Sequence, residues 1–564
     1  MISHFLKSRV KNLELAFCLS AVLGVALFLI WRVKYGVDFT DEALTYAAPY
    51  RFFLGDQPFR DDFFVYQLSS LILYPVLKCF WLISGHTDGT VIFGRYLYLF
   101  FSGLVAFSIY YCLKDLVPNR VRVLIALVAW VFVPFKIFAL GYNPLAIGFL
   151  TFAFFSSRLA PSPEMPRHSI FYFGLGLFQG LGVFAYPSLV LTFVPLGIYF
   201  WKKNGIGSPF YYFMGAVLVP IVMFLSFGIS VKDFIASAQF IANASSSSGH
   251  AWNANQILVL MEEAVSLFRC RVLHLIWILA FLYSVKKKNQ FLTLILGILF
   301  PVLAFFSNAS SRGGPGERGY IIEFAVAGIY FFWLLSRTAE DWKLFNLICI
   351  PSMIAGIIFA WSSNNGLPHA ALGLFPAALV SQLWLVRLMR AEKSESPLLF
   401  LSYLPLVLTL CMSLREDTTV FMDDPLKTLK SPIQNGIFKG LYTSERKKQY
   451  WTEMSRLLEK DRERDTGRIA FYPHFPAGYL MTKMRPGTYT VWGGCPEGMG
   501  KCVESFKSKS QAPDVFVQVK SLYYNQTRTD VFETPDQDKI VNDLISQGAM
   551  QEDSADIRVL RLSK

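Results

Sequence analysis

The chain has 564 residues, of which 54% are hydrophobic and only 16% are charged, whereas soluble domains carry about 25% charged residues. The mean hydropathy of +0.41 and the repeated apolar blocks of membrane length predict a polytopic membrane protein. The net charge is +13, but the basic residues form short clusters between apolar blocks and no single patch. We therefore exclude a nucleic-acid partner.

Residues 1–414 are predicted to form a membrane domain of about thirteen transmembrane helices. Their apolar blocks lie at about 13–31, 91–113, 121–137, 144–158, 169–184, 187–201, 209–229, 272–285, 291–306, 319–336, 343–361, 368–389 and 397–414. The first block follows the basic segment "MISHFLKSRVKN", and we interpret it as a retained helix rather than a signal peptide. A further apolar stretch at 64–83 is interrupted by Gln67, Pro75 and Lys78. We expect it to be a juxtamembrane helix within the first outer loop, 32–90.

The distribution of basic residues predicts the orientation of the helices. With the N-terminus in the cytoplasm, the predicted inner loops contain Lys7, Arg9, Lys11, Lys114, Arg120, Arg122, Arg158, Arg167, Lys202, Lys203, Lys286, Lys287, Lys288, Arg337, Lys343, Arg387, Arg390 and Lys393. The outer turns near Tyr186 and Asn364 contain no lysine or arginine. We therefore predict an integral membrane protein, of a bacterial inner or plasma membrane, with its C-terminal part outside the cytoplasm.

Residues 415–564 are polar and predict a soluble extracytoplasmic α/β domain. The segments "GRIAFYPHFPAGYLM" and "PDVFVQVK" are typical of short buried strands, and "SERKKQYWTEMSRLLEKDRER" of an amphipathic helix. We expect this domain to cover the active site or to grip an acceptor; the alternative is a purely stabilising role. Cys495 and Cys502, in "GGCPEGMGKC", are predicted to form a disulfide, with a reduced pair as the alternative.

The segment "GVDFTDEALTYAAPYRFFLGDQPFRDD", at 36–62, places a cluster of carboxylates directly after the first apolar block. Carboxylates beside lipid are costly and are usually functional. One interpretation is structural: Thr40 caps a helix whose first turn contains Asp41 and Glu42, while the other acidic residues are solvated. Another is a site for a divalent cation, Mg or Mn, on the adjacent carboxylates of Asp61 and Asp62.

Three other predicted outer loops are rich in neutral hydrogen-bonding groups, which suit the hydroxyls of a sugar. They read "GYNP" at 141–144, "SNASSRGGPGERGY" at 307–320 and "SSNNGLPH" at 362–369. The candidate substrate-binding residues in them are Tyr142, Asn143, Asn308, Asn364 and His369. For Asn143 the alternative is a helix cap. Arg318, Arg312 and Arg95, in that order, are candidates for binding a phosphate, and interfacial snorkelling is the alternative for each.

A family resemblance covers nearly the whole membrane region. The segment "DFTDEALTYAAPYRFFLGDQPFRD" matches the first-loop pattern of the GT-C superfamily of membrane glycosyltransferases: Asp-Glu, a tyrosine, Gly-x-x-Pro and a further Asp. "YQLSSLILYPVLKCFWLISG" resembles that family's juxtamembrane helix. "FGRYLYLFFSGLVAFSIYYCL" resembles its second span, and "FGLGLFQGLGVFAYPSLVLTFVPL" its glycine-rich fifth and sixth spans. Protein O-mannosyltransferases and the aminoarabinose transferase of lipid A belong to this superfamily.

The resemblance implies a GT-C-like fold and a function. The donor would be a polyprenyl-phosphate-linked sugar, a hexose or pentose, and transfer to a hydroxyl of a lipid, glycan or protein acceptor would invert the anomeric carbon. Asp41 would be the catalytic base, with Glu42 as its neighbour or a cation ligand. This sequence departs from the family at Tyr142 and Asn143, where a second carboxylate is common. The alternative functions are a transporter or flippase for a lipid-linked or amphipathic solute, and a scaffold without catalysis.

Overall fold

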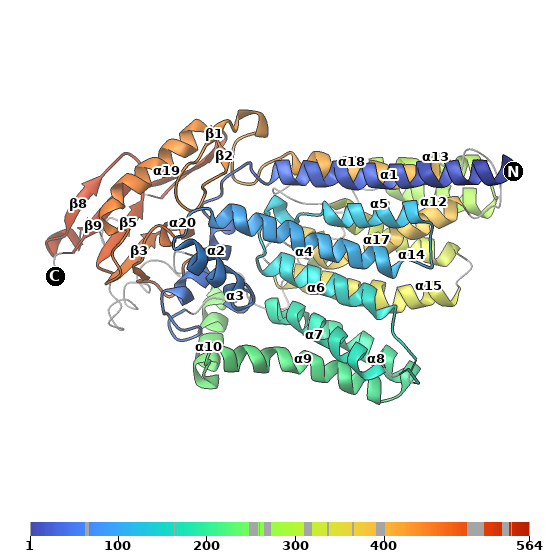
Figure 1. Ribbon diagram of the computed structural model, residues 1–564, viewed down its shortest axis with the longest axis horizontal. Helices are drawn as coiled ribbons and strands as arrows, with labels where there is room; N and C mark the ends of the chain where they lie inside the picture. The colour runs from blue at the N-terminus through green and yellow to red at the C-terminus, as the bar shows by residue number, and fades with distance from the viewer. Residues whose placement is uncertain are drawn as a thin grey trace.

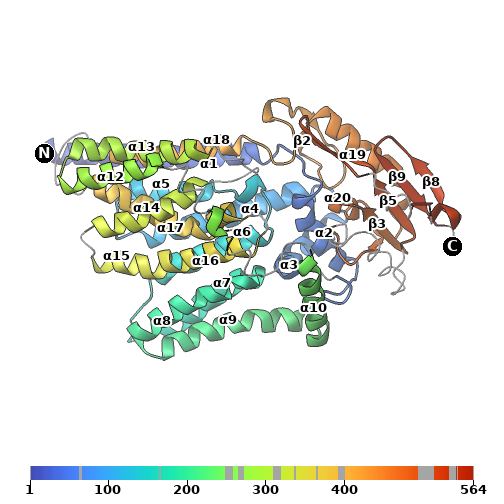
Figure 2. The same ribbon diagram turned by 180° about the vertical axis from the view of Figure 1, so that it is seen from behind.

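Most of the chain forms a long bundle of helices, and the strands gather at one end of it (Figure 1). The computed structural model describes residues 2–62, 67–162, 164–165, 167–247, 258, 260–263, 272–308, 319–335, 338–363, 366–390, 401–492, 513–532, 541–542 and 544–562. The N-terminus lies at the far end of the bundle, and the C-terminus lies beyond the strands (Figures 1 and 2).

The helices of the bundle follow the predicted apolar blocks. They are α1 (Ile2–Arg32), α4 (Thr90–Cys112), α5 (Asn119–Trp130), α6 (Tyr142–Ser157), α7 (His168–Ala185), α8 (Phe193–Asn204), α9 (Gly207–Ser226), α12 (Val272–Lys286), α13 (Gln290–Asn308), α14 (Gly319–Leu334), α15 (Ala339–Leu344), α16 (Ile350–Trp361), α17 (Ala370–Met389) and α18 (Leu404–Asp417). In the described part, seven helices are long and apolar enough to cross a membrane. The count of thirteen spans remains a prediction.

Helices α2 (Asp41–Phe53), α3 (Gln67–Ser84) and α10 (Val231–Ser247) lie between the bundle and the strands (Figure 1). Although α3 has the length and composition of a membrane span, its two ends meet the same end of the bundle. Near its start, Leu68 and Leu71 cluster with Phe184, in the last turn of α7. Near its end, Phe80 stacks on Phe93 at the start of α4, with ring centroids 4.4 Å apart. The assignment of α3 as a juxtamembrane helix stays a prediction.

Basic residues from the predicted inner loops gather at the opposite end of the bundle. Arg120 pairs with Glu14 of α1 at 3.3 Å, and Arg158 pairs with Glu340 of α15 at 3.3 Å. These pairs join helices distant in sequence at the end farthest from the strands. The positive-inside rule makes that end cytoplasmic, and the orientation remains a prediction.

The C-terminal region contains a five-stranded sheet in the order β4-β3-β5-β9-β8 and two smaller sheets. Its elements are β1 (Ser431–Pro432), β2 (Tyr442–Thr443), α19 (Glu445–Leu457), β3 (Arg468–Tyr472), α20 (Pro476–Tyr479), β4 (Arg485–Pro486), β5 (Val515–Val519), β6 (Ser521–Asn525), β7 (Arg528–Val531), β8 (Met550–Asp553) and β9 (Ile557–Arg561). Strands β3 and β5 pair in parallel, with Ile469 opposite Val515. Helix α19 and strand β5 confirm two of the elements that the sequence predicts here, and β3 confirms the first part of the third. The second part of that segment is wrong as a strand, because Pro476–Tyr479 forms the short helix α20.

Strand β5 is buried along its whole length because both faces of the sheet are covered. Val515 and Val517 belong to the main core, whereas Phe516 packs on the other face with Leu560. The region is joined to the bundle near α2, where Ala477 of α20 donates a backbone hydrogen bond to Phe39 at 3.2 Å. The start of α2 therefore lies where the bundle and the C-terminal region meet.

Candidate functional site

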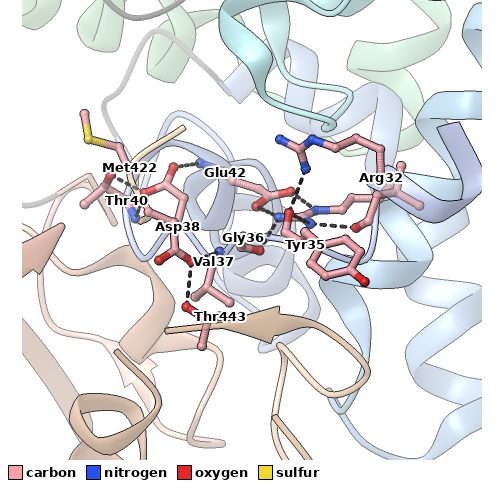
Figure 3. A network of polar contacts seen from close by, with 12 residues as sticks. Arg32, Tyr35, Gly36, Val37, Asp38, Thr40, Glu42, Met422 and Thr443 are labelled. Carbon is pink, nitrogen blue, oxygen red and sulfur yellow. Dashed lines mark hydrogen bonds and ion pairs between the residues drawn. The ribbon is translucent and has the colours of Figure 1, made fainter. Parts of the chain in front are cut away.

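Helix α2 begins at Asp41 with Thr40 as its N-cap residue, as the sequence predicts, but the side chain that accepts from the helix N–H groups is that of Asp38 and not that of Thr40. The Asp38 carboxylate accepts hydrogen bonds from the Glu42 N–H at 2.7 Å, the Thr40 N–H at 2.9 Å and the Thr40 hydroxyl at 2.6 Å (Figure 3). These bonds satisfy donors that the start of a helix leaves unpaired. The interpretation of Asp38 as a solvated loop residue is wrong, because only 3% of it is exposed.

Glu42 is held by an arginine from the second predicted span. Arg95 of α4 donates to both Glu42 oxygens, at 2.7 and 2.6 Å, a bidentate geometry that is strong when buried. Its remaining N–H groups donate to the carbonyl oxygens of Val33, Tyr35 and Gly36. All five Arg95 donors are thus used within the protein. This corrects the predictions of Arg95 as a phosphate ligand and of Glu42 as an available carboxylate.

A glycine allows α2 and α4 to approach closely enough for this ion pair. A Cβ atom on Gly94 would lie 2.3 Å from the ring of Tyr46, closer than any side chain tolerates. Tyr46 and Tyr50 are both buried, so α2 packs inside the protein along this side. The arginine next to Gly94 is thereby brought against the first turn of α2.

The other carboxylates of the acidic segment surround a buried arginine, Arg51. Its Nε donates to Asp56 at 2.7 Å, its Nη2 donates to the Asp61 carbonyl, and its Nη1 lies 3.8 Å from Asp62. Burial alone would raise the pKa of Asp61. The N–H of Gln57 and the neighbouring arginines outweigh that effect and lower the pKa. The prediction of solvated loop residues is wrong here too, because Asp56, Asp61 and Asp62 are all buried.

The surroundings of Asp61 and Asp62 test the predicted site for a divalent cation. The positive charge beside Asp61 and Asp62 is a guanidinium of the chain itself. Within the described ranges, no group of three or more His, Cys, Asp or Glu side chains is placed to hold a metal ion. The described residues therefore do not fit the predicted Mg or Mn site.

The C-terminal region clamps the loop that precedes α2. Phe39 inserts its ring among four aromatic side chains of that region, with centroid distances between 5.3 and 5.8 Å: Phe438, Tyr450, Trp451 and Phe475. Its neighbour Val37 donates a backbone hydrogen bond to Asp423 at 2.8 Å, and Thr443 donates to the same carboxylate oxygen at 2.6 Å. The backbone around Asp38 is thus fixed from the C-terminal side.

A buried lysine lies beneath this loop. Lys447 of α19 is 1% exposed, donates to the carbonyls of Met422 and Tyr524, and lies 5.2 Å from the Phe39 ring centroid. Burial lowers the Lys447 pKa, and the carboxylates of Asp423 and Asp38 oppose that shift. A positive charge supplied by the C-terminal region therefore faces the acidic loop.

Asp41 differs from these neighbours because it remains partly exposed while Asp38 and Glu42 are buried. Burial by surrounding protein, and then the negative charge of Asp38, raise the Asp41 pKa to about 7; Arg528 of β7 opposes the rise. A carboxylate with this pKa takes up and releases a proton near neutral pH, as a general base requires.

The start of α6 lies beside the same face of α2. Asp41 and Thr45 are one helical turn apart and share a face, and a Cβ on Gly141 would lie 3.2 Å from the Thr45 hydroxyl. Asn143 is 5% exposed, and its Oδ1 has no hydrogen-bond partner in the described part of the chain. Tyr142 stacks on Tyr186 at 5.7 Å. The structure thus brings the predicted residues Tyr142 and Asn143 close to the helix that carries Asp41.

A small pocket lies behind α2, lined by Arg32, Tyr35, Asp38, Glu42 and Lys136 among others. Arg32 is buried and donates to the carbonyls of Tyr35, Asp417 and Thr419. The pocket therefore combines carboxylates and cations at the junction of the bundle and the C-terminal region.

Several predicted residues lie elsewhere. His369 is buried, with its ring 5.1 Å from Phe135 and 5.8 Å from Phe359, which corrects its prediction as an accessible substrate contact. Asn308 closes α13, and its side chain is outside the described part. Further predicted residues lie wholly outside the described residues: Arg312, Arg318, Asn364, Cys495 and Cys502.

Sequence reasoning missed Arg51, Lys447, Arg528 and Asp423. Lys447, Arg528 and Asp423 lie far along the chain from Asp41. Arg51 lies close to its partners in sequence, but one arginine in an acidic segment does not indicate which carboxylates it contacts. One signal was present for Lys447: it falls on the apolar face of the predicted amphipathic helix, beside Tyr450, Trp451 and Met454. A charged residue on such a face is unusual unless it has partners.

Replacing Asp38 by Asn tests whether Asp38 helps to raise the Asp41 pKa. Asn retains an oxygen for capping α2 but removes the negative charge, so Asp41 should deprotonate at lower pH. For any reaction in which Asp41 acts as the base, we expect the acid limb of the pH–rate profile to move to lower pH. Thr40→Val is the control, because it weakens the cap contact without changing charge and should leave the limb in place. An unmoved limb in Asp38→Asn would contradict the assignment.

No protein-family model matches this chain. No curated protein matches its sequence at a significant level either.

Proposed function

We propose that this protein is an integral-membrane glycosyltransferase of GT-C type. It moves a hexose or pentose from a polyprenyl-phosphate-linked donor to a hydroxyl of a lipid, glycan or protein acceptor on the extracytoplasmic face. The observation that carries the proposal is Asp41: a partly exposed carboxylate with a pKa near 7, held at the end of an apolar helical bundle by a capped and clamped loop.

In the proposed reaction, Asp41 accepts the proton of the acceptor hydroxyl while the hydroxyl oxygen attacks the anomeric carbon. The bond from that carbon to the phosphate oxygen breaks, and polyprenyl phosphate leaves with both electrons of the bond. Attack opposite the leaving group inverts the configuration. Because phosphate is already a good leaving group, the protein has only to deprotonate the acceptor and to balance the charge of the departing phosphate.

Two features support the remaining parts of the proposal. Asn143 offers a buried amide oxygen near the face of α2 that carries Asp41. Arg318 and Arg312 remain the proposed phosphate ligands. The C-terminal region holds the Asp41 loop through Phe39 and Asp423, which supports the expectation that this region covers the active site.

The test compares cells that contain the protein with cells that lack it. Mass spectrometry measures the lipids, glycans and glycoproteins of their envelopes. We expect cells that lack the protein to lose one hexose or pentose mass from an envelope molecule, and to regain it when the wild-type chain is restored. Unchanged envelope sugars, together with accumulation of a lipid-linked solute on the cytoplasmic side, would contradict the proposal and favour the flippase alternative.

A further inference from the structure

A second cavity lies outside the Asp41 site, as an open groove at the junction of α1, α18 and the C-terminal region. Its volume is about 730 Å³, and the residues that line it include Trp31, Tyr35, Lys427, Lys430 and Tyr442. Its floor is rigid, because the chain after α1 pairs with β2: Gly36 donates to the Tyr442 carbonyl at 2.8 Å, and Tyr442 donates to the Lys34 carbonyl at 2.8 Å.

One wall of the groove is a row of aromatic rings that continues from α1. The ring centroids of Trp31 and Tyr35 are 5.1 Å apart. The Tyr35 ring stacks on the Tyr442 ring, with centroids 5.4 Å apart and an interplanar angle of 27°. Trp and Tyr side chains are typical of the depth at which lipid headgroups meet the hydrocarbon. Below the row, α1 presents an exposed apolar face that includes Leu23 and Leu27, 60% and 58% exposed. The groove therefore opens directly onto a surface suited to lipid chains.

The opposite wall is cationic. Lys427 and Lys430 are exposed, and within the described residues their ammonium groups form no ion pair or hydrogen bond. None of the residues that line the groove is acidic. Nearby, Glu445 accepts a hydrogen bond from the Ser431 hydroxyl at 2.7 Å, so this carboxylate is already engaged. Two ammonium groups without a counter-charge in the lining of the groove thus lie beside an aromatic wall and an apolar helix face.

We propose that this groove binds the phosphate headgroup of an anionic membrane lipid, whose acyl chains lie on the exposed face of α1. The lysines pair with the phosphate, and the aromatic row contacts the glycerol region of the lipid. Apolar area, aromatic contact and complementary charge together match an amphipathic anion rather than a neutral lipid. This proposal does not depend on glycosyl transfer. Because Tyr35 lines both this groove and the pocket beside Asp38 and Glu42, the bound lipid lies one side chain from the acidic loop.

The experiment measures binding of fluorescent phosphatidylglycerol and phosphatidylcholine to the purified full-length protein in neutral detergent. Each lysine near a lipid headgroup contributes about 1 kcal/mol, so we expect Lys427→Gln with Lys430→Gln to weaken phosphatidylglycerol binding about 30-fold. The wild-type protein should bind phosphatidylcholine more weakly than phosphatidylglycerol. The substitutions should leave the binding of phosphatidylcholine unchanged. Lys427→Arg with Lys430→Arg should restore the affinity for phosphatidylglycerol, which excludes a folding defect as the cause.

The matched control is Lys439→Gln with Lys448→Gln, two lysines of the same region that do not line the groove. This pair should leave affinity at the wild-type level. Equal losses in the two double variants, or no loss in the Lys427 and Lys430 pair, would overturn the proposal. Inorganic phosphate at millimolar concentration should not displace phosphatidylglycerol. Displacement at that concentration would show a site for free phosphate and would also overturn the proposed lipid site.

Discussion

Replacing Asp41 by Asn is expected to lower the rate of sugar transfer about 10³-fold, because a positioned general base contributes 10² to 10⁴ in rate. The amide has the same shape as the carboxylate but cannot accept the acceptor's proton. The measurement is restoration of the missing envelope sugar in cells that lack the chromosomal copy, followed by initial rates in isolated membranes. Full restoration by Asp41→Asn would contradict the role of Asp41 as base.

The same substitution, Asp41→Asn, should raise the free energy of unfolding. A loss of activity in this variant therefore cannot come from a loss of stability. The pKa of Asp41 is raised from 3.8 to about 7 in the folded state, so the folded protein binds the proton more tightly than the unfolded chain. Stability is therefore lost as pH rises from about 4 to 7, and the loss is complete above pH 7. Asn removes this loss, which is worth about 2 kcal/mol after allowance for partial exposure.

We therefore expect the thermal unfolding temperature of Asp41→Asn in detergent to exceed that of the wild type at pH 8 and to match it at pH 4. The control is Asp115→Asn, which changes an exposed aspartate in the turn between α4 and α5, at the far end of the bundle. It should alter neither transfer nor the unfolding temperature. A lower unfolding temperature for Asp41→Asn at pH 8 would show that the carboxylate stabilises the fold and is not held under strain.

Breaking the Glu42–Arg95 pair should destabilise the protein by about 3–5 kcal/mol, because either single substitution leaves a buried, uncompensated charge or polar group. Glu42→Gln keeps the Arg95 bonds to loop carbonyls, whereas Arg95→Met removes them all. We expect Arg95→Met to be the more damaging change. The double variant should be less unstable than the sum of the two single variants. Thermal and denaturant unfolding of all four proteins in the same detergent measure this coupling.

The exposed pair of Glu453 and Arg456 on α19 is the matched control for the coupling. These side chains are 2.8 Å apart, against 2.6 Å in the buried pair, but 62% of the Arg456 side chain and 36% of the Glu453 side chain are exposed. The corresponding cycle of Glu453→Gln and Arg456→Met should give less than about 0.5 kcal/mol. If the buried cycle gives no more than this exposed one, then Glu42 is not held by Arg95 in solution and is available for catalysis.

Much of the fold could be predicted because the pattern of apolar residues within each segment drives the formation of its helix or strand. Runs of apolar residues produce the helices of the bundle, and the alternation and periodicity of residues 444–464, 467–481 and 513–520 produce α19, β3 and β5. The first turn of α2 was predictable for the same reason, since acidic residues favour a helix N-terminus. In each case the burial pattern of the segment is set within a few residues of the chain.

The roles of the carboxylates were not predictable in this way. Six acidic residues lie within residues 38–62, and the sequence alone treats them as nearly equivalent. The structure separates them by the partner that the fold brings to each: Arg95, distant in sequence, holds Glu42, whereas the nearby Arg51 holds Asp56 and Asp62, and the helix start holds Asp38. Only Asp41 stays partly exposed with a pKa near neutrality.

The sequence by itself thus determined that this is a helical, membrane-type chain with a polar C-terminal region and an acidic segment between them. The tertiary structure alone decided which carboxylate is available for proton transfer and which are neutralised. The physical reason is the sequence separation over which the interactions act. Helix and strand formation depend on neighbouring residues. The charge state of a buried carboxylate depends on any cation that the fold brings within a few ångströms. Lys447, Arg95 and Arg528 come from distant parts of the chain, so only folding places them there.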